Sequence, residues 1–423
     1  MKKLTAIVLG FGSRGSKYAK YACEHPEELE IVAVADPVQN RLQTAKETHD
    51  LKEEQLYTDW RELAKLPKIA DFAVIATQDR DHLEPALVMI EKGYHLLLEK
   101  PMAATPEECK LIVEAAEKKG VKVIIGHVLR FTKFWRKLKD LLDDGCVGKI
   151  VSITHTEAVG NEHQSHSFVR GNWRNAEEST PMIVQKSCHD MDILQWLIGK
   201  ECKKVQSFGG LRYFTKRNKP EGAPDYCVKG CPVADTCVYN AVKLYYDDKE
   251  NFWFRKAATK RVEPPTDEEV WDAISNTNYG RCVFDCDNNV VDHQIVNLVF
   301  EDDITVNFTM NAFNKGGRDI RIYGTAGELI ADMDEGHIKI YSFATKEYTE
   351  IDLEQISGSI TSGHGGGDTG IMEDLIKYFN DEETSKSICD LRTSYKNHLI
   401  AFAAEKARKE GAIIDFEQYE SNI

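Results

Sequence analysis

A glycine-rich turn close to the N-terminus limits the folds open to this chain more than any other feature. The apolar, partly β-branched run Leu4–Leu9 comes directly before Gly-Phe-Gly-Ser-Arg-Gly, and residues 16–23 follow with helical spacing. A strand, a tight glycine turn and a helix in this order are typical of a dinucleotide-binding fold. In that fold Gly10 allows the turn, Gly12 lets phosphate approach the backbone, and Gly15 lets the helix pack on the strand. The residues predicted to hold the phosphates are Gly10, Gly12, Ser13, Arg14 and Gly15.

Short buried runs alternate with helix-like segments through the first 125 residues. The further runs are Ile31–Ala35, Phe72–Ala76, His95–Leu98 and Val121–Ile125. Strands that alternate with helices form parallel sheets covered on both faces. Residues 1–125 are therefore predicted to be a doubly wound Rossmann domain of the α/β class.

An acidic residue ends the second predicted strand. Asp36 follows Ile31–Ala35, and Pro37 comes next, where the strand has to stop. A carboxylate at this position accepts hydrogen bonds from both ribose hydroxyls, which favours NAD over NADP. Arg14 and Arg41 keep NADP as the less favoured alternative, because a 2′-phosphate attracts cations.

The pattern changes after residue 125 and predicts a second, α+β domain over residues 126–423. Strand-like alternation dominates, with few helices, so a mainly antiparallel open sheet with one covered face is expected. The predicted strands are Ile150–Glu157, Val205–Phe214, Val291–Phe300, Thr305–Asn311, Arg318–Tyr323 and His337–Tyr341. One helix is expected over Pro181–Ile198, and two C-terminal helices lie within about 368–410, the second of them stopped by Gly411.

Length and charge exclude several classes of function. A chain of 423 residues exceeds one ordinary domain, and its formal net charge of -15 opposes binding to nucleic acid or anionic lipid. No apolar run approaches the roughly 18 residues of a membrane span. The apolar N-terminal run reaches glycine at once, as a strand does and a signal peptide does not. We expect a cytoplasmic protein with reduced thiols.

A lysine follows the buried run Leu96–Leu98 in the sequence Glu99-Lys100-Pro101. Ligands of open α/β sheets bind at the carboxyl ends of the strands. A partly desolvated lysine there has its pKa lowered from about 10.4 towards neutrality and can act as acid and base. Taken alone, Lys100 is better interpreted as a solvated loop lysine.

Five segments together resemble the Gfo/Idh/MocA family of sugar and polyol oxidoreductases, over nearly the whole chain. They are Gly10–Gly15, Ala76-Thr77 with His82, Glu99–Pro101, Gly126–Phe131 and His189–Asp192. The resemblance implies an N-terminal Rossmann domain and a C-terminal domain whose open sheet often joins subunits. A homo-oligomer, dimer or tetramer, with a small carbohydrate substrate is therefore expected.

The same resemblance assigns roles to individual residues. Lys100 would contact the reacting hydroxyl, with Glu99 paired nearby, and His189 would touch the substrate and share proton transfer, as its titration near neutral pH allows. Thr77 and His82 would line the nicotinamide side of the cleft. Arg130, within the fourth segment, is a substrate-binding candidate.

One position departs from the family pattern. Many of these dehydrogenases carry aspartate four residues before the histidine, but here Gln185 stands there and Lys186 follows. We interpret Gln185 as a substrate-binding residue and Lys186 as a further catalytic candidate. A proton relay without a third member is the alternative.

A cysteine cluster lies in an insert over about residues 215–286 that the family fold does not require. Cys227, Cys231, Cys237 and Cys282 are the favoured ligands of a structural zinc ion, in preference to any set with Cys286. An iron–sulfur cluster is the rival, and unliganded buried thiols are the third alternative. The insert is expected to cover the active site.

A glycine-rich segment, residues 362–368, precedes the first C-terminal helix. Glycine lets backbone approach a ligand closely, so His364 is a candidate to reach substrate hydroxyls and Asp368 a candidate helix N-cap. A linker that ends in a cap is an equal alternative.

Together these features predict an NAD-dependent oxidoreductase that transfers hydride between nicotinamide and a secondary alcohol of a sugar, polyol or glycoside. The nearer alternative is an NAD-dependent glycosidase, which oxidises a sugar carbon transiently and then eliminates. The distant alternative is a non-catalytic regulator that binds dinucleotide and sugar.

Overall fold

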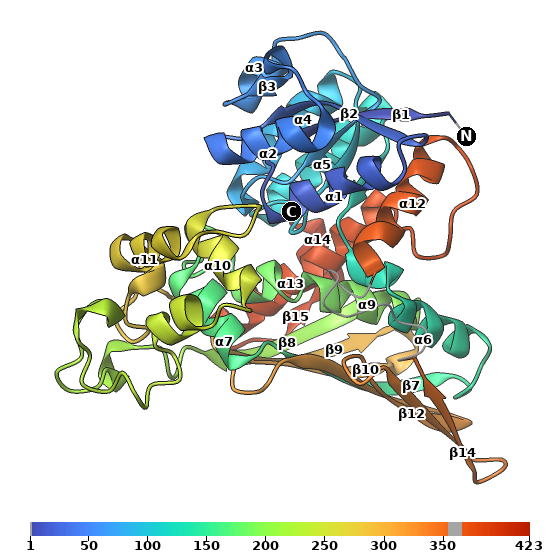
Figure 1. The fold of residues 1–423 in the computed structure, drawn as a ribbon. Helices are drawn as coiled ribbons and strands as arrows, with labels where there is room; N and C mark the ends of the chain where they lie inside the picture. The colour runs from blue at the N-terminus through green and yellow to red at the C-terminus, as the bar shows by residue number, and fades with distance from the viewer. Residues whose placement is uncertain (1, 354–365) are drawn as a thin grey trace.

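The computed structural model describes residues 2–353 and 366–423, and it places them around two β-sheets (Figure 1). The N-terminal sheet is parallel and covered by helices on both faces, whereas the second sheet carries helices on one face only (Figure 1). The predicted fold class, a Rossmann domain followed by an α+β domain on an open sheet, is confirmed.

The N-terminal sheet has the strand order β3-β2-β1-β4-β5-β6. Its strands are β1 (Leu4–Leu9), β2 (Leu29–Ala35), β3 (Leu56–Tyr57), β4 (Phe72–Ile75), β5 (His95–Leu98) and β6 (Val123–Ile125). The sheet order reverses direction between β1 and β4, where Leu9 pairs with Ala35 on one side and Ile75 on the other. Ligands bind at this switch point in doubly wound folds.

Five helices accompany this sheet: α1 (Ser13–Glu24), α2 (Gln39–His49), α3 (Trp60–Ala64), α4 (Leu83–Glu91) and α5 (Pro106–Lys119). Helix α5 shows why the local sequence is helical. The Thr105 hydroxyl accepts from the Glu108 amide, Pro106 occupies the first turn, and Gly120 ends the helix at φ 70°.

Within the described residues the second sheet has the order β14-β13-β12-β11-β7-β10-β9-β8-β15. Its strands are β7 (Ile150–Ala158), β8 (Cys202–Gly210), β9 (His293–Phe300), β10 (Thr305–Asn311), β11 (Gly317–Gly324), β12 (Gly327–Asp332), β13 (His337–Ser342), β14 (Tyr348–Asp352) and β15 (Ile414–Asp415). Pairing is antiparallel except between β7 and β10, so the sheet is mixed. The sequence did not predict β12, β14 or β15.

Helices α6 (Lys133–Asp143), α8 (Met182–Gln185), α9 (Cys188–Ile198), α13 (Leu391–Glu410) and α14 (Phe416–Ser421) belong to this second part of the chain. The prediction of one helix over Pro181–Ile198 was wrong: α8 ends at Gln185, and α9 begins after Ser187, whose φ of -97° and ψ of 6° leave the helical region. Lys186 therefore lies in a helix break. Gly411 ends α13 at φ 65°, as predicted.

The insert is more helical than the alternation of strands indicated. It contains a π-helical segment, Val242–Asp247, with α10 (Phe252–Thr259) and α11 (Asp267–Asn276), and the short α7 (Asn161–His163) and the π-helical Gln164–Arg170 lie beside it. These helices pack around their own small core, which includes Tyr245, Phe254 and Ile274. The expectation of few helices in this part of the chain was wrong.

Helix α12 (Gly367–Phe379) packs with the N-terminal domain although it comes late in the sequence. Ile371, Leu375 and Phe379 share a core with strands β1, β2 and β4. The prediction of Asp368 as N-cap was wrong, because Gly366 at φ 85° precedes the helix and the Asp368 carboxylate instead pairs with Arg14. The boundary at residues 125 and 126 stays a prediction.

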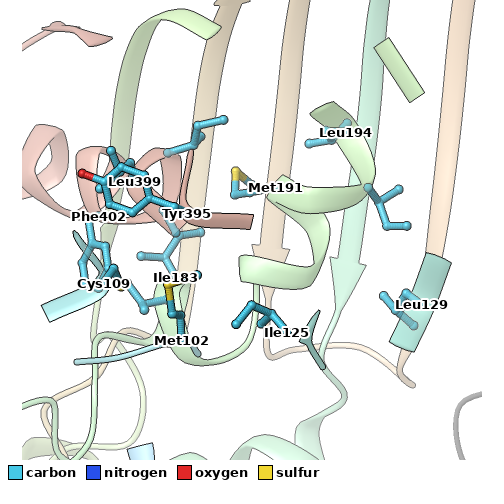
Figure 2. Close-up of a cluster of buried hydrophobic side chains, with 14 of the residues drawn as sticks. Met102, Cys109, Ile125, Leu129, Ile183, Met191, Leu194, Tyr395, Leu399 and Phe402 are labelled. Atoms are coloured by element: carbon cyan, nitrogen blue, oxygen red, sulfur yellow. The ribbon is translucent and has the colours of Figure 1, made fainter. Parts of the chain in front are cut away.

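The largest apolar core runs from the first sheet into the second domain. Met102 and Ile125 of the N-terminal part lie near Ile183 and Met191 and near Leu399 of α13 (Figure 2). The two parts are thus packed against each other beside β5 and β6. In the described part of the chain, no helix is both long and apolar enough to cross a membrane.

Candidate active site and cofactor site

The glycine turn has the shape that a bound pyrophosphate needs. Gly10 has φ 89°, and a Cβ on it would lie 2.5 Å from the Ala76 carbonyl oxygen. A Cβ on Gly15 would lie 1.9 Å from the Gly10 carbonyl oxygen, so both positions require glycine. At Gly12 the nearest atom to such a Cβ is in the flexible Arg41 side chain, at 3.4 Å. Helix α1 has no side-chain cap at its start, so its first amides can receive an anion.

Asp36 lies at the end of β2 beside this turn and is buried. Its Oδ2 accepts from the Phe11 amide at 2.7 Å, and its Oδ1 accepts from the Val38 amide at 2.8 Å. The Arg41 guanidinium is 3.4 Å from Oδ2. The carboxylate is thus held in place by the backbone at the position that contacts a ribose in this fold.

Glu99 follows β5 and joins Arg14 in a buried ionic group. Its Oε1 accepts from Arg14 Nε, at a distance of 2.5 Å, and from the Tyr18 hydroxyl at 2.7 Å. Burial raises the pKa of Glu99, but the charges of Arg14 and Lys100 outweigh this and keep that pKa below its usual value. Glu99 is therefore ionised, and the Arg14 guanidinium is engaged by Glu99 and by Asp368.

Thr77 and His82 support the turn that carries Pro101. The His82 ring is buried, with Nδ1 2.7 Å from the Pro101 carbonyl oxygen and Nε2 3.3 Å from the Thr77 carbonyl oxygen. The Thr77 hydroxyl donates to the Asp81 carbonyl. These contacts give His82 a structural task beside the predicted nicotinamide site.

Lys100 reaches from the N-terminal domain to the second domain. Its Nζ donates to the carbonyl oxygen of Gln185, the last residue of α8, at 2.8 Å, and its backbone amide donates to Glu99 Oε2. The lysine is half-buried, and its ammonium lies where the two domains meet. Gln185 contacts Lys100 through its backbone, whereas its side chain is the predicted substrate ligand.

His189 lies in the first turn of α9 and is 6% exposed. Its ring is 6.0 Å from the His127 ring, and the His398 ring lies 5.3 Å beyond His127. His398 Nε2 accepts from the Met102 amide at 3.0 Å, which requires the proton on Nδ1, where it is donated to the Ser394 carbonyl. Burial lowers the pKa of His398 to about 3, so its ring is neutral.

Lys186 lies in the helix break and is paired with the sheet beneath it. Its Nζ is 3.2 Å from Glu157 Oε1, and Glu157 also pairs with Arg318. Burial lowers the pKa of Lys186, and the charges of Arg318 and Lys100 lower it further, against the opposing effect of Glu157. Lys186 and Lys100 are therefore close enough to influence each other.

Arg130 is 3% exposed and is held by α9. Its Nε and Nη2 donate to the two carboxylate oxygens of Asp192, each at 2.7 Å, and Asn397 also donates to Asp192. A bidentate buried pair of this kind uses the fork geometry of the guanidinium fully. The substrate role predicted for Arg130 therefore stays a prediction, and its contacts are those of a structural residue.

One residue near the lysines was not identified from the sequence. His163 ends α7, and its pKa is lowered by burial and by the charges of Lys186 and Lys100. Its ring makes an edge contact with Trp253 of α10 at 4.9 Å. No motif signals this position, because it lies outside the five segments on which the family resemblance was recognised.

The insert contacts both ends of the site. On the cofactor side, Arg41 Nε donates to the Lys260 carbonyl oxygen at 3.1 Å, and Val262 packs against the core of the N-terminal domain. On the other side, Trp253 lies beside His163. Helix α10 and residues 260–262 thus run from the lysine side to the edge at Asp36, and that the insert covers the site stays a prediction.

The four cysteines predicted to bind metal line one cavity together with Arg170. They are Cys227, Cys231, Cys237 and Cys282. His364 lies outside the described residues, so its predicted contact with substrate is not placed.

Two family models match the chain. Residues 4–127 match the "Oxidoreductase family, NAD-binding Rossmann fold" of the Gfo/Idh/MocA group, and residues 139–416 match its "Oxidoreductase family, C-terminal alpha/beta domain". These two ranges include the glycine turn, Lys100 and His189.

Several curated proteins are similar in sequence. The chain is 24% identical to a putative oxidoreductase, YteT, of Bacillus subtilis over 72% of each chain. It is 26% identical to inositol 2-dehydrogenase of Salmonella typhimurium over 48% of this chain and 57% of that protein. It is 29% identical to 2,7-anhydro-N-acetylneuraminate hydratase of Mediterraneibacter gnavus over 50% of this chain and 53% of that protein. The match thus spans little more than half the length of the latter two relatives.

A solved structure shares the fold over nearly its full length. An oxidoreductase from Agrobacterium radiobacter, in complex with NAD+, L-tartaric acid and magnesium, superposes with a TM-score of 0.67. It is 14% identical and covers 98% of this chain and 99% of that one.

Proposed function

Because the chain belongs to the Gfo/Idh/MocA oxidoreductase family, we propose that it transfers hydride between NAD and a secondary alcohol of a sugar, polyol or glycoside. The observation that carries the proposal is the position of Lys100: its ammonium lies at the domain junction, where it meets the carbonyl end of α8. Lys186 and His189 come from the adjoining helix break and helix.

The cofactor assignment rests on how well the residues fit a dinucleotide. Glycines stand where a Cβ would collide with the turn, the first amides of α1 have no side-chain cap, and the Asp36 carboxylate is fixed by two backbone amides. NAD, when bound, supplies the hydride acceptor or donor. Asp36 favours NAD over NADP because a carboxylate repels a 2′-phosphate and accepts from ribose hydroxyls.

The chain's own residues handle the proton. The substrate hydroxyl replaces the Gln185 carbonyl as the partner of Lys100, which in its neutral form takes the proton as the carbinol hydrogen leaves. In its charged form Lys100 stabilises the developing alkoxide. Glu99 remains ionised and accepts a hydrogen bond from the Lys100 backbone amide.

His189 is the second proton-transfer candidate, and Lys186 the third. Lys186 has a lowered pKa, so a neutral amine is more accessible to it than to a solvated lysine. Its pairing with Glu157 anchors it to the sheet, and this suits a residue that orients a substrate oxygen. Gln185 is proposed to bind substrate through its side chain.

A sugar or polyol is the favoured substrate class, because the relatives that are named by activity are inositol dehydrogenases and an anhydro-sugar hydratase. The hydratase relative also supports a redox-neutral alternative, in which transient oxidation at one carbon acidifies the neighbouring C–H before elimination. The proposed NAD-dependent glycosidase is one form of it. Both reactions use the same NAD site and the same Lys100.

The test is a panel of inositols, sugars, polyols and glycosides incubated with NAD. Absorbance reports NADH, and mass spectrometry reports the product. Stoichiometric NADH with a product lighter by two hydrogens supports the dehydrogenase, whereas cleaved or hydrated product without net NADH supports the alternative. If neither outcome occurs with any compound, the result would contradict a catalytic function and would support the alternative of a non-catalytic regulator that binds dinucleotide and sugar.

A lysine pair provides the matched control. Lys100→Met should lower kcat by about a hundredfold to ten-thousandfold while NAD still binds, because only proton transfer and alkoxide stabilisation are lost. Lys119→Met on α5, which removes an exposed ion pair with Glu91 of α4, should leave kcat unchanged. Equal activity in the two variants would refute the role of Lys100.

The open face of the second sheet supports a homo-oligomer. Phe208 and Ile295 are cross-strand partners on this face, and Tyr323 and Tyr348 extend it, each at least 36% exposed. Clustered exposed apolar residues are typical of subunit interfaces. Light scattering of the protein should give a dimer or tetramer, and Ile295→Lys should yield monomers; a monomeric wild type would contradict this proposal.

A further inference from the structure

Four thiols of the insert meet in a cavity that the proposed redox chemistry does not use. Cys227, Cys231, Cys237 and Cys282 line it with Arg170, and we refer to it as the four-thiol cavity. Three of these cysteines come from one short segment, and the fourth lies about fifty residues further on. Cys286 does not line the cavity, and its thiol instead contacts the Cys282 carbonyl oxygen.

The backbone brings the distant cysteine to the others. Tyr226 and Arg281 form an antiparallel bridge, and the Cys282 amide donates to the Asp225 carbonyl oxygen at 2.8 Å. Cys227 and Cys282 therefore follow the two bridged residues on paired segments, and both line the four-thiol cavity. The geometry thus selects the same four cysteines as their spacing in the sequence.

The sulfur atoms of the four cysteines are spread more widely than the thiolates around one bound zinc ion. A zinc ion lies about 2.3 Å from each thiolate, which places four tetrahedral sulfurs about 3.8 Å apart. Among the described residues, no three of these thiols have their sulfur atoms all within 4.8 Å of one another. Four thiolates around an iron–sulfur cluster are spread more widely, since the iron and sulfide atoms lie between them.

Arg170 supplies a second, independent observation. The Arg170 side chain is buried, and the ionisable groups that act on it are the Tyr245 phenol and the thiols of Cys227, Cys286 and Cys282. Its Nε and Nη2 donate to backbone carbonyls, but Nη1 makes no hydrogen bond of normal geometry to the described residues. No carboxylate in this part of the chain pairs with it.

A buried cation without an anionic partner is costly, and arginine cannot lose its charge. Four thiolates bound to an iron–sulfur cluster carry net negative charge and accept N–H hydrogen bonds at sulfur. Arg170 Nη2 is already 3.8 Å from Cys227 Sγ. An anionic cluster would therefore compensate Arg170 where neutral thiols cannot.

We propose that Cys227, Cys231, Cys237 and Cys282 bind an iron–sulfur cluster, with Arg170 as its charge partner. The cluster joins the insert to the π-helical segment Gln164–Arg170, which begins directly after His163 and so borders the catalytic lysines. It holds the cover of the active site in place. This proposal does not depend on the redox function proposed above.

The first experiment measures what the purified wild type contains. Protein prepared without oxygen should hold iron and acid-labile sulfide in equal amounts, two or four of each per chain, and should absorb broadly in the visible range. Reduction with dithionite should bleach this absorption and give an electron paramagnetic resonance signal. One equivalent of zinc without iron, or neither metal after reconstitution with ferrous iron and sulfide, would overturn the proposal.

Cysteine variants test the ligand set. Cys231→Ser and Cys237→Ser should lose most of the iron, and a protease should then cut within residues 215–286 much faster than in the wild type. Cys286→Ser is the matched control and should retain full iron content, because this thiol lies outside the cavity. Iron retained in both ligand variants, or lost in the control, would refute this ligand set. If a ligand variant fails to fold, the metal content of the wild type decides.

Discussion

Replacing Asp36 by asparagine tests the basis of cofactor selection most directly. The carboxylate is buried and accepts from two backbone amides at 2.7 and 2.8 Å, so its orientation towards the ribose site is fixed before NAD binds. Asp36→Asn keeps the shape but removes the charge and turns an NH2 group towards one of these donors. Hydrogen bonds to charged groups contribute about 1.5–3 kcal/mol, so the Kd for NAD should rise about 10- to 150-fold.

NADP should respond in the opposite direction. In the wild type the Arg41 guanidinium lies 3.4 Å from the Asp36 carboxylate. In Asp36→Asn this cation faces no opposing charge there and can pair with a 2′-phosphate. The affinity for NADP should therefore rise while that for NAD falls, and Arg41→Ala in the same background should cancel the gain.

Fluorescence titrations with both nucleotides at one ionic strength measure the effect, since phosphate binding depends on salt. Glu30→Gln is the control, because Glu30 is an exposed carboxylate on the same strand, paired with Lys3. An unchanged Kd for NAD in Asp36→Asn, or tighter binding of NADP than NAD by the wild type, would refute the reasoning.

Three further substitutions separate structural from functional roles. Asp192→Asn removes the charge that pairs with the buried Arg130 and should lower the free energy of unfolding by up to about 3–5 kcal/mol, measured from the urea midpoint. An unchanged midpoint with a higher KM would instead support the predicted role of Arg130 in substrate binding. Gly12→Ala meets only the Arg41 side chain, so the melting temperature without NAD should hold while the NAD-induced shift shrinks; a full shift would show that phosphate stays clear of Gly12. Burial lowers the pKa of Lys186 in the folded protein, so between this lowered pKa and about 10.4 the unfolded chain binds more protons, and the free energy of unfolding rises with pH. Lys186→Met should reduce the slope of this rise by up to about 1.4 kcal/mol per pH unit. An unaltered slope would show that Lys186 stays protonated.

Local sequence was sufficient wherever neighbouring residues decide the conformation. The turn at Gly10 and the end of α13 at Gly411 both need positive φ, and glycine marks both. The strands Leu4–Leu9 and Thr305–Asn311 occur with the predicted bounds, because runs of alternating or continuous apolar residues specify their burial. The break between α8 and α9 at Ser187 was not predicted, and neither was the pairing of Lys186 beside it with Glu157, on a strand nearly thirty residues away.

The candidate site divides in the same way. Sequence alone determined the cofactor turn, Asp36 and the lysine that follows β5, because each is a short motif at the end of a strand. Only the tertiary structure decided which charges face each other: Arg14 with Glu99 and Asp368, and Arg130 with Asp192. Such pairs join segments that are far apart in the chain, so the sequence alone does not show which acidic residue pairs with which basic one.

The insert illustrates this most clearly. Its cysteine spacing suggested a metal, but that spacing could not distinguish one ion from a cluster or place Arg170 beside the thiols. Those distinctions depend on distances between sulfur atoms and on the charge buried around them, and both arise only when paired segments bring Cys227 and Cys282 together. The sequence therefore identified the cysteines as candidate metal ligands. Which kind of metal group they can hold depends on how the folded chain places their sulfur atoms and Arg170.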